Sequence, residues 1–359
     1  MRTLLTAALL AALCRAQPKT ETGDLNGAAF KIDVPEKWNG GLVVYCHGYS
    51  PVPVRYTNPK PNPVLGVFLE EGYAVAQSGY AAGGWAAQEA LQDTEALRRY
   101  FASKYGAPKE TWVTGPSFGG FLTAMIMERF PNSYDGGLAL CGSISPKEWS
   151  MPRGTFDTRV VFDYYFPGAL PSPAKSSDFT MGAERTASLR KLLDDKPEAA
   201  AALRGFTRIR TNAEVASTIS LYTHILNDLN RRAGGNPFDN RNTIYEGAGD
   251  DNAANRGVAR YAADPRAAEY LRLYTTTGRL VRPMLAIQTT YDPIIPAWGT
   301  NMYSTMAGLA GVAELFVQQS IPRDGHCNIP AADVRRGFAE LREWKSGGKR
   351  PRPGIITSP

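Results

Sequence analysis

Histidine is scarce in this chain of 359 residues, which contains only His47, His224 and His326. No His-Glu-x-x-His motif is present, and none of the four cysteines has the spacing of a zinc site. The run Gly-Ala-Gly-Asp-Asp-Asn at 247–252 fits a solvated polar loop better than a calcium site. The sequence therefore predicts neither a metal site nor a cofactor, and the three histidines can be weighed one by one.

The chain also lacks a long hydrophobic run. The apolar stretch from Leu4 to Leu13 is too short to span a bilayer, and Arg2 precedes it, so residues 1–16 are predicted to be a signal peptide cleaved after Ala16. A lipoprotein attached through Cys14 is the weaker alternative, because the preceding leucine is bulky where a small residue is expected. We therefore expect a secreted or periplasmic protein with no membrane span.

No basic run with interleaved aromatic side chains occurs. The chain has 40 Lys and Arg against 34 Asp and Glu, a net charge of +6. Loss of the signal peptide removes Arg2 and Arg15 and no acid, which leaves 38 − 34 = +4. Because this mild positive charge is spread along the chain, nucleic acid is not expected as a partner.

The most informative motif is Gly115-Pro116-Ser117-Phe118-Gly119, which has the pattern Gly-x-Ser-x-Gly. The β-prone segment 111–114 precedes it, and the apolar, helix-periodic segment 120–130 follows it. A serine between a strand and a helix is the nucleophile elbow of serine hydrolases, in which small glycines permit a sharp turn. Ser117 is therefore the candidate nucleophile.

The general base must follow the serine and the acid in the chain order of this kind of site. His47 precedes Ser117, and His224 lies inside a charged, helix-prone stretch at 220–232. His326 instead follows the β-prone run 315–319, at a place where a loop after the last strand is expected. His326 is therefore the candidate base.

The candidate acid is Asp292, which follows the apolar strand predicted at 283–290. Its carboxylate would hold the imidazole in one tautomer and stabilise the imidazolium formed during proton transfer. The alternative is that Asp292 only caps the next helix. Asp324 is a rival acid, but at two positions from His326 it has difficulty reaching the far imidazole nitrogen.

An oxyanion loop is predicted where the strand 41–45 runs into Cys46-His47-Gly48-Tyr49. The backbone N–H groups of Tyr49 and Phe118 are the candidate donors to the tetrahedral oxygen, while His47 would brace the loop.

The chain resembles α/β-hydrolase-fold serine hydrolases of the secreted esterase, lipase and peptidase type. The resemblance lies in the order of the motifs along the chain and extends from Ala28 to Trp344. Four features carry the resemblance: His47-Gly48, the segment 115–119, Asp292 and His326. The resemblance implies an α/β fold with a mostly parallel central sheet flanked by helices.

The sequence also resembles tannase-like and feruloyl esterases, in which a cysteine after the histidine pairs with a cysteine just before the serine. Cys327 follows His326, but Pro116 occupies the other position. This departure argues against a tannase-type site.

The alternation of strands and helices stops between about 142 and 278, and about 135 residues are too many for a loop. We expect an α/β-hydrolase core at 17–141 and 279–345, in which residues 17–26 are a polar leader, and a mainly helical cap insertion at 142–278. The Gly- and Pro-rich residues 346–359 are expected to form a flexible tail.

Several aromatic residues are candidates for the wall of a substrate pocket beneath this cap. The alternative is that the cluster in the insertion is simply the hydrophobic core of the cap. The candidates are Trp85, Trp149, Tyr164, Tyr165 and Phe166.

Three cysteines remain after removal of the signal peptide. Cys327 flanks the candidate base, and Cys141 ends the strand after the elbow, so both are expected at one edge of the sheet. A Cys141–Cys327 disulfide is therefore predicted, with Cys46 as a free thiol inside a strand.

The sequence thus favours a serine hydrolase that cleaves carboxylic esters, in small or polymeric substrates, through an acyl-enzyme. A serine peptidase of the same fold is the alternative, and a non-catalytic binding protein is less consistent because all three triad residues are present. The sequence leaves the oligomeric state and the acyl and alcohol groups open.

Overall fold

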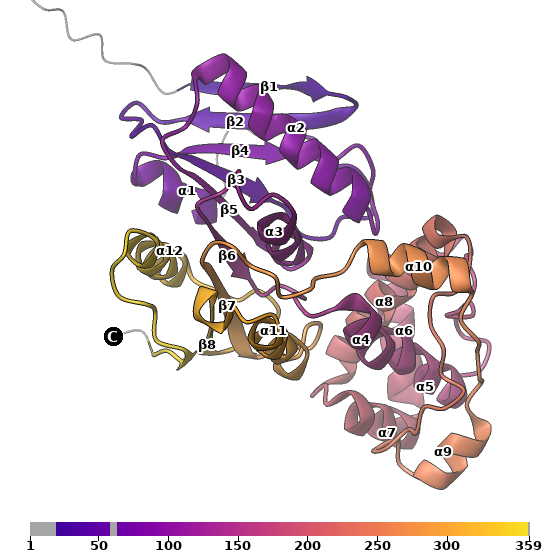
Figure 1. Cartoon of the computed structure of the whole chain (residues 1–359). Coiled ribbons are helices and arrows are strands. Elements are labelled where there is room, and N and C mark those ends of the chain that lie inside the picture. Colours follow the sequence, from indigo (N-terminus) through magenta and orange to yellow (C-terminus); the bar gives the residue numbers. More distant parts are fainter. Residues whose placement is uncertain (1–18, 58–62, 358–359) are drawn as a thin grey trace, which may run out of the picture.

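The computed structural model describes residues 19–57 and 63–357, and the predicted signal peptide lies outside these ranges. Within them, nine strands form one sheet in the order β1-β2-β4-β3-β5-β6-β7-β8-β9 (Figure 1). β2 runs antiparallel to β1 and to β4, and every other neighbouring pair is parallel. The strands are β1 Lys19–Leu25, β2 Ala28–Val34, β3 Leu42–Cys46, β4 Ala74–Ser78, β5 Thr111–Pro116, β6 Gly136–Leu140, β7 Met284–Tyr291, β8 Phe316–Asp324 and β9 Gly354–Ile355.

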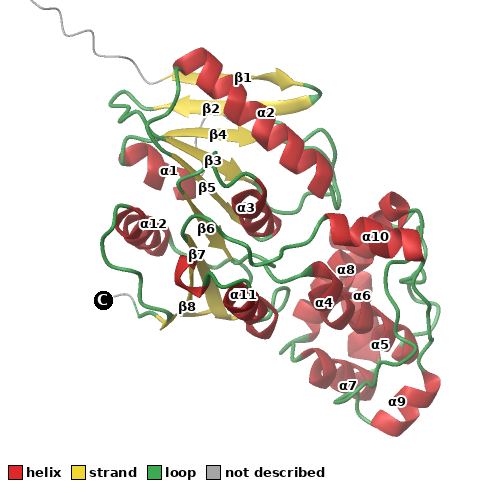
Figure 2. Cartoon of the chain, in the orientation of Figure 1, coloured by secondary structure: helices red, strands yellow, loops and turns green. Residues whose placement is uncertain are grey.

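The central strands are apolar runs because both faces of the sheet are covered. Every residue of β3, β4 and β6 is buried. Helices α1 (Pro63–Glu70) and α12 (Ala331–Lys345) pack on one face. Helices α2 (Ala87–Tyr105), α3 (Phe118–Arg129) and α11 (Ala297–Leu309) lie on the other, as Figure 2 shows. A 3₁₀ turn, η2 (Ala313–Leu315), leads into β8.

A helical insertion separates β6 from β7 and forms its own lobe beside the sheet (Figure 1). It is called the cap below. Its elements are α4 Lys147–Met151, the π-helix η1 Pro152–Phe156, α5 Asp157–Tyr165, α6 Ala183–Asp195, α7 Pro197–Thr207, α8 Asn212–Ala233, α9 Asp251–Gly257 and α10 Pro265–Leu273.

The two ends of the described chain differ from the sequence-based expectation. Residues 17–26 look like a polar leader, but 19–25 form the edge strand β1, whose residues pair with β2. The expected flexible tail instead contains β9, which pairs with Gln319 and Ser320 of β8. Arg350 and Arg352 contribute further hydrogen bonds there, to the carbonyl of Phe316 and from the side chain of Gln319.

The α/β-hydrolase fold predicted from the sequence is confirmed by this arrangement. The elbow joins β5 to α3, the candidate acid follows β7, and the candidate base follows β8. Among the helices within residues 19–57 and 63–357, none combines the length and the apolar character of a membrane span.

Candidate active site

The elbow forces Ser117 into an unusual backbone conformation, with φ 57° and ψ −118°. The two flanking glycines make this turn possible because of what surrounds them. A side chain at Gly115 or at Gly119 would collide with the carbonyl oxygen of Cys46, which belongs to the neighbouring strand β3. The elbow therefore packs directly against the backbone of β3, and the half-buried side chain of Ser117 stands at the end of β5.

The structure brings the three candidate triad residues together although they lie on three separate loops. The Oγ atom of Ser117 is 2.8 Å from Nε2 of His326. The Nδ1 atom of the same ring is 2.7 Å from Oδ2 of Asp292. The side chain of His326 is 20% exposed and that of Asp292 is 0% exposed. The imidazole thus faces solvent on one side and a fully buried carboxylate on the other.

Backbone groups hold the carboxylate of Asp292. Its Oδ1 atom accepts hydrogen bonds from the N–H groups of Ile294 and Ile295, at 2.8 and 2.9 Å. The side chain of Gln288 donates to the carbonyl of Ile295 at 2.8 Å, which fixes the far side of this turn. Because Oδ1 is occupied, Oδ2 is left facing the imidazole.

Asp324, the rival acid, points elsewhere. Its carboxylate accepts from the guanidinium of Arg210 at 2.6 Å, and its side chain is 65% exposed. The guanidinium of Arg210 also stacks on the ring of Tyr291 at 3.7 Å. Asp324 therefore joins the histidine loop to the cap and makes no contact with the imidazole that would suit a triad acid.

The loop that carries His326 is tied down on both sides. Cys327 forms a disulfide with Cys141, as predicted, and Cys46 is a buried free thiol. The N–H of Gly325 donates to the carbonyl of Tyr291 at 2.8 Å. Pro116 is paired in register with Leu140, so Cys141 lies beside the position where a cysteine would precede the serine. The absence of a cysteine at 116 is therefore matched by a cysteine directly after the adjacent strand.

The predicted oxyanion loop lies against the elbow. A Cβ atom on Gly48 would contact the carbonyl oxygen of Pro116 at 3.5 Å and Cβ of Ser117 at 3.7 Å. Phe118 is the first residue of α3, where helical N–H groups have no partner within the helix. The ring of Tyr49 packs edge-on against that of Phe118, with centroids 6.2 Å apart. The two candidate donors therefore belong to touching residues.

His47 has a structural environment. Its Nδ1 atom is 2.7 Å from the carbonyl oxygen of Gly48, and its ring stacks on Tyr80 at 3.9 Å. Burial lowers the pKa of this imidazole, which keeps it neutral. This geometry suits a residue that braces the loop.

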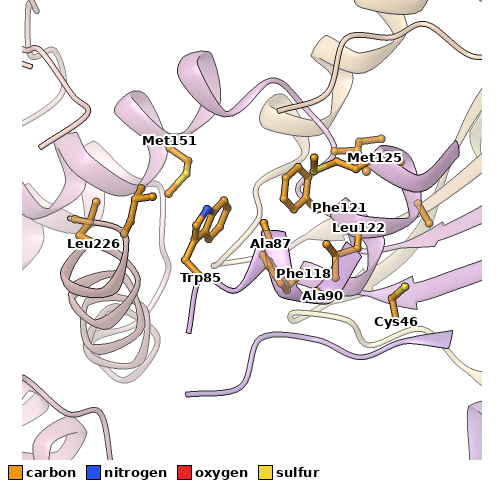
Figure 3. Packing of buried hydrophobic residues seen from close by; sticks show 14 of the residues in the cluster. Cys46, Trp85, Ala87, Ala90, Phe118, Phe121, Leu122, Met125, Met151 and Leu226 are labelled. Atoms are coloured by element: carbon orange, nitrogen blue, oxygen red, sulfur yellow. The ribbon is translucent and has the colours of Figure 1, made fainter. Parts of the chain in front are cut away.

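The aromatic candidates for the pocket are found in different surroundings. Trp85 is buried between Met151 and Leu226 of the cap and the phenylalanines of α3, as Figure 3 shows, so it fills the junction between cap and core. Trp149 is half-buried and lines an open cleft, where its ring meets that of Trp298 at 5.6 Å.

The cluster Tyr164, Tyr165 and Phe166 does not reach that cleft. Phe166 is buried and stacks on Phe162, and the hydroxyl of Tyr165 hydrogen-bonds to the carbonyl of Ala248. These contacts lie within the cap and none of the three residues lines the cleft, which favours the alternative that the cluster belongs to the hydrophobic core of the cap.

The cleft between cap and core has a volume of about 1250 Å³. Its walls come from the cap, including Trp149, Arg153 and Tyr222, and from residues 290–305 of the core. Asp292 belongs to its lining, whereas Ser117 and His326 do not. The cleft therefore borders the triad on the side of the acid.

Sequence reasoning missed two features of the site. The turn formed by Ile294 and Ile295 follows Asp292-Pro293, a pattern that favours an aspartate accepting from nearby backbone N–H groups. The side chain of His224, from the cap, reaches the hydroxyl of Tyr49. The sequence indicates this contact only weakly, through polar residues at positions 224, 228 and 232 of one helix, which are spaced four apart.

Across residues 19–57 and 63–357, no group of three or more His, Cys, Asp or Glu side chains is placed to hold a metal ion.

Comparisons with solved structures give distant likenesses. An acylaminoacyl peptidase from Pyrococcus horikoshii is 10% identical, with a TM-score of 0.48 over 93% of this chain and 42% of that one. A Pyrococcus furiosus esterase is 13% identical, with a TM-score of 0.46 over 92% and 88%. A puromycin hydrolase is 13% identical, with a TM-score of 0.49 over 95% and 40%. The chain thus spans less than half the length of the peptidase and of the puromycin hydrolase.

No curated protein sequence gives a significant match. A family model does match residues 17–276, which is more than half of the chain. The matched part contains the predicted oxyanion loop, the elbow and most of the cap, and it ends before Asp292 and His326. The chain belongs to the tannase-like family of unknown function (DUF6351).

Proposed function

We propose that the protein is a serine hydrolase that cleaves carboxylic esters through an acyl-enzyme. The observation that carries the proposal is the continuous hydrogen-bonded chain from Ser117 through His326 to Asp292, with distances of 2.8 and 2.7 Å. A serine, an imidazole and a buried carboxylate in this order are what nucleophilic acyl transfer requires.

The first half-reaction is attack of Ser117 Oγ on the carbonyl carbon while Nε2 of His326 takes the hydroxyl proton. Asp292 stays ionised, keeps the ring in position and stabilises the imidazolium. The carbonyl oxygen becomes an oxyanion, which would accept hydrogen bonds from the N–H groups of Phe118 and Tyr49. Collapse of this intermediate expels the alcohol, which takes the proton from His326.

In the second half-reaction water gives a proton to the same nitrogen and attacks the acyl carbon. Collapse of the second tetrahedral intermediate breaks the bond to Ser117 Oγ, which takes the proton back from His326, and releases the acid. Each step passes a proton through Nε2 of His326, and the partial exposure of this ring leaves it accessible to the alcohol and then to water. The described geometry therefore suits both halves of the reaction.

We propose an ester rather than a peptide as the substrate, and the tannase-like description of the family supports this choice. We further propose that the cap, residues 142–278, selects the substrate, because its residues supply one wall of the cleft beside Asp292. The Cys141–Cys327 disulfide supports a location outside the cytoplasm, where such bonds persist.

The test is a panel of chromogenic esters and peptide amides, measured on the wild-type protein and on Ser117→Ala. We expect turnover of esters, little or none of amides, and a fall in kcat of about 10⁶-fold in the variant. Preferential turnover of amides would establish the peptidase alternative. Equal turnover by both proteins would exclude Ser117 as the nucleophile.

A further inference from the structure

His224 is the histidine that neither the triad nor the predicted oxyanion loop uses. It lies in the middle of α8, the longest helix described in the cap, and its ring is half-buried. Its Nδ1 atom is 2.6 Å from the hydroxyl oxygen of Tyr49, which belongs to the core. The two rings meet edge to face, with centroids 5.8 Å apart. A cap side chain therefore touches the loop that is expected to hold the oxyanion.

Tyr49 is held on two sides. Its ring packs against Phe118 at 6.2 Å, and its hydroxyl is engaged by His224. The backbone just before it lies close to the nucleophile, since a Cβ atom added to Gly48 would be 3.7 Å from Cβ of Ser117. A shift of the Tyr49 side chain would therefore move a backbone segment that lies only one residue from the elbow contact.

The helix that carries His224 is itself fixed to the core. One turn further along, Asp228 accepts a hydrogen bond from the backbone N–H of Trp85 at 2.5 Å. One turn beyond that, Arg232 donates to the carbonyl of Gly83 and to Glu89, both at 2.8 Å. Residues 224, 228 and 232 share one face of the helix because they are spaced by four. This face joins the cap to three core segments.

The contacts between α8 and the core are buried and close, which indicates that this helix is held in a fixed position on the core. Asp228 is buried, with a side-chain exposure of 2%, and it pairs with Arg232 at 2.8 Å. A side chain at Gly84 would collide with the carboxylate of Asp228, so the core loop approaches α8 as closely as its backbone allows. Burial lowers the pKa of His224, against the influence of Asp228, so the ring is neutral near pH 7.

We propose that His224 is a positioning residue for the oxyanion hole, through its hydrogen bond to the hydroxyl of Tyr49. The cap thereby takes part in stabilising the transition state and does more than select the substrate. This inference rests on the proposed function, because it assigns Tyr49 N–H to the oxyanion. A purely structural role, in which the bond only helps to dock the cap, makes a different prediction.

The experiment compares His224→Ala, Tyr49→Phe and the double variant on a small activated ester, p-nitrophenyl acetate, which avoids the rest of the cap. We expect each single variant to lower kcat about ten- to a hundredfold, with KM within about twofold of wild type. Because both changes remove the same bond, the double variant should be no worse than the poorer single one.

Conservative replacements sharpen the test. His224→Asn keeps a polar atom near the place of Nδ1 and should recover part of kcat, whereas His224→Gln places its amide nearer to Nε2 and should not. The matched control is Glu89→Gln, which weakens another contact from the same face of α8 far from Tyr49. It should lower the urea midpoint of unfolding and leave kcat near wild type.

Three results would overturn the inference. Wild-type kcat in both His224→Ala and Tyr49→Phe would do so while leaving Ser117 as the nucleophile. A loss of kcat in Glu89→Gln equal to that in His224→Ala would mean that cap docking alone is at work. Absence of ester turnover and of fluorophosphonate labelling at Ser117 in the wild-type protein would remove the proposed function and this inference with it.

Discussion

Ser117 illustrates how much of the site depends on single residues. Its positive φ is tolerated because Gly115 and Gly119 leave no side chain between the elbow and the carbonyl of Cys46. Asp292 depends similarly on its neighbours, since two backbone N–H groups occupy one oxygen and leave the other for the imidazole. The proposed chemistry therefore rests on close backbone contacts as well as on the three candidate reactive groups.

At this scale we predict that Asp292→Asn lowers kcat by about 10⁴-fold, because an amide favours the wrong imidazole tautomer. Asp324→Asn should change kcat by less than about twofold, since Asp324 pairs with the exposed Arg210. Steady-state kinetics on a chromogenic ester measure both. The reverse order of effects would transfer the role of acid to Asp324.

The residues of the triad could be predicted from the sequence because chain order and strand ends constrain them. Ser117, Asp292 and His326 each follow a strand that is recognisable from a β-prone or apolar run. The contact of His224 with Tyr49 joins residues 175 positions apart, and no local pattern specifies the partner of a helical histidine. Its detection required the packing of the cap on the core.

At the scale of secondary-structure elements, a disulfide joins the end of strand β6 to the loop after strand β8. It links Cys141 to Cys327 across 186 residues, beside the candidate base. Since the same loop also bonds through Gly325 to Tyr291, the imidazole is fixed by one covalent and one hydrogen-bonded anchor.

We predict that Cys141→Ser, Cys327→Ser and the double variant all lower the free energy of unfolding by about 2–4 kcal/mol, without additivity. Urea unfolding measures the effect. A reducing agent should lower the stability of the wild-type protein to that of the double variant and leave the double variant unchanged. Additive losses, or a wild-type protein that is insensitive to reduction, would contradict the assigned linkage.

The central elements are predictable because β3, β4 and β6 are buried throughout and therefore largely apolar. The edge elements are less so. β1 is almost wholly exposed and reads as a polar leader, and β9 is two residues long within a Gly- and Pro-rich segment. Both owe their structure to backbone pairing with a neighbouring strand, which leaves little trace in side-chain pattern.

Two aromatic residues of the cap are expected to have different roles, one in contacting the substrate and the other in packing. We predict that Trp149→Ala changes the ranking of bulky esters relative to p-nitrophenyl acetate, because Trp149 lines the cleft. Phe166→Ala should instead destabilise the protein by about 3–5 kcal/mol and lower all activities together, because Phe166 is buried. Turnover ratios and urea midpoints distinguish the two. A changed ranking in Phe166→Ala alone would return the pocket to that cluster.

At the scale of the whole molecule, the two chain segments that connect the cap to the core are hydrogen-bonded to each other. The backbone N–H of Lys147 donates to the hydroxyl of Thr275 at 2.8 Å, and Thr276 donates to the carbonyl of Ile144 at 2.6 Å. The ammonium of Lys147 is fully buried, donates to the carbonyl of Ser145 at 3.1 Å and faces the ring of Phe121 at 4.1 Å.

Burial lowers the pKa of Lys147 to about 7, from an ordinary value of 10.5. Between about pH 7 and 10 the unfolded chain therefore holds a proton that the folded protein has lost, so the contribution of Lys147 to stability rises with pH. We predict that the stability difference between the wild-type protein and Lys147→Met moves in favour of wild type from pH 7 to pH 9.5. Urea unfolding at both values tests this, and a constant difference would contradict it.

The central claim is that Ser117 is the nucleophile of a serine hydrolase. The most direct measurement is reaction with a fluorophosphonate, followed by mass spectrometry of the intact protein and of its peptides. We predict one added group per chain, located on the peptide that contains Ser117, and no labelling of Ser117→Ala. Labelling at another serine, or an unmodified wild-type protein that still hydrolyses esters, would contradict the account.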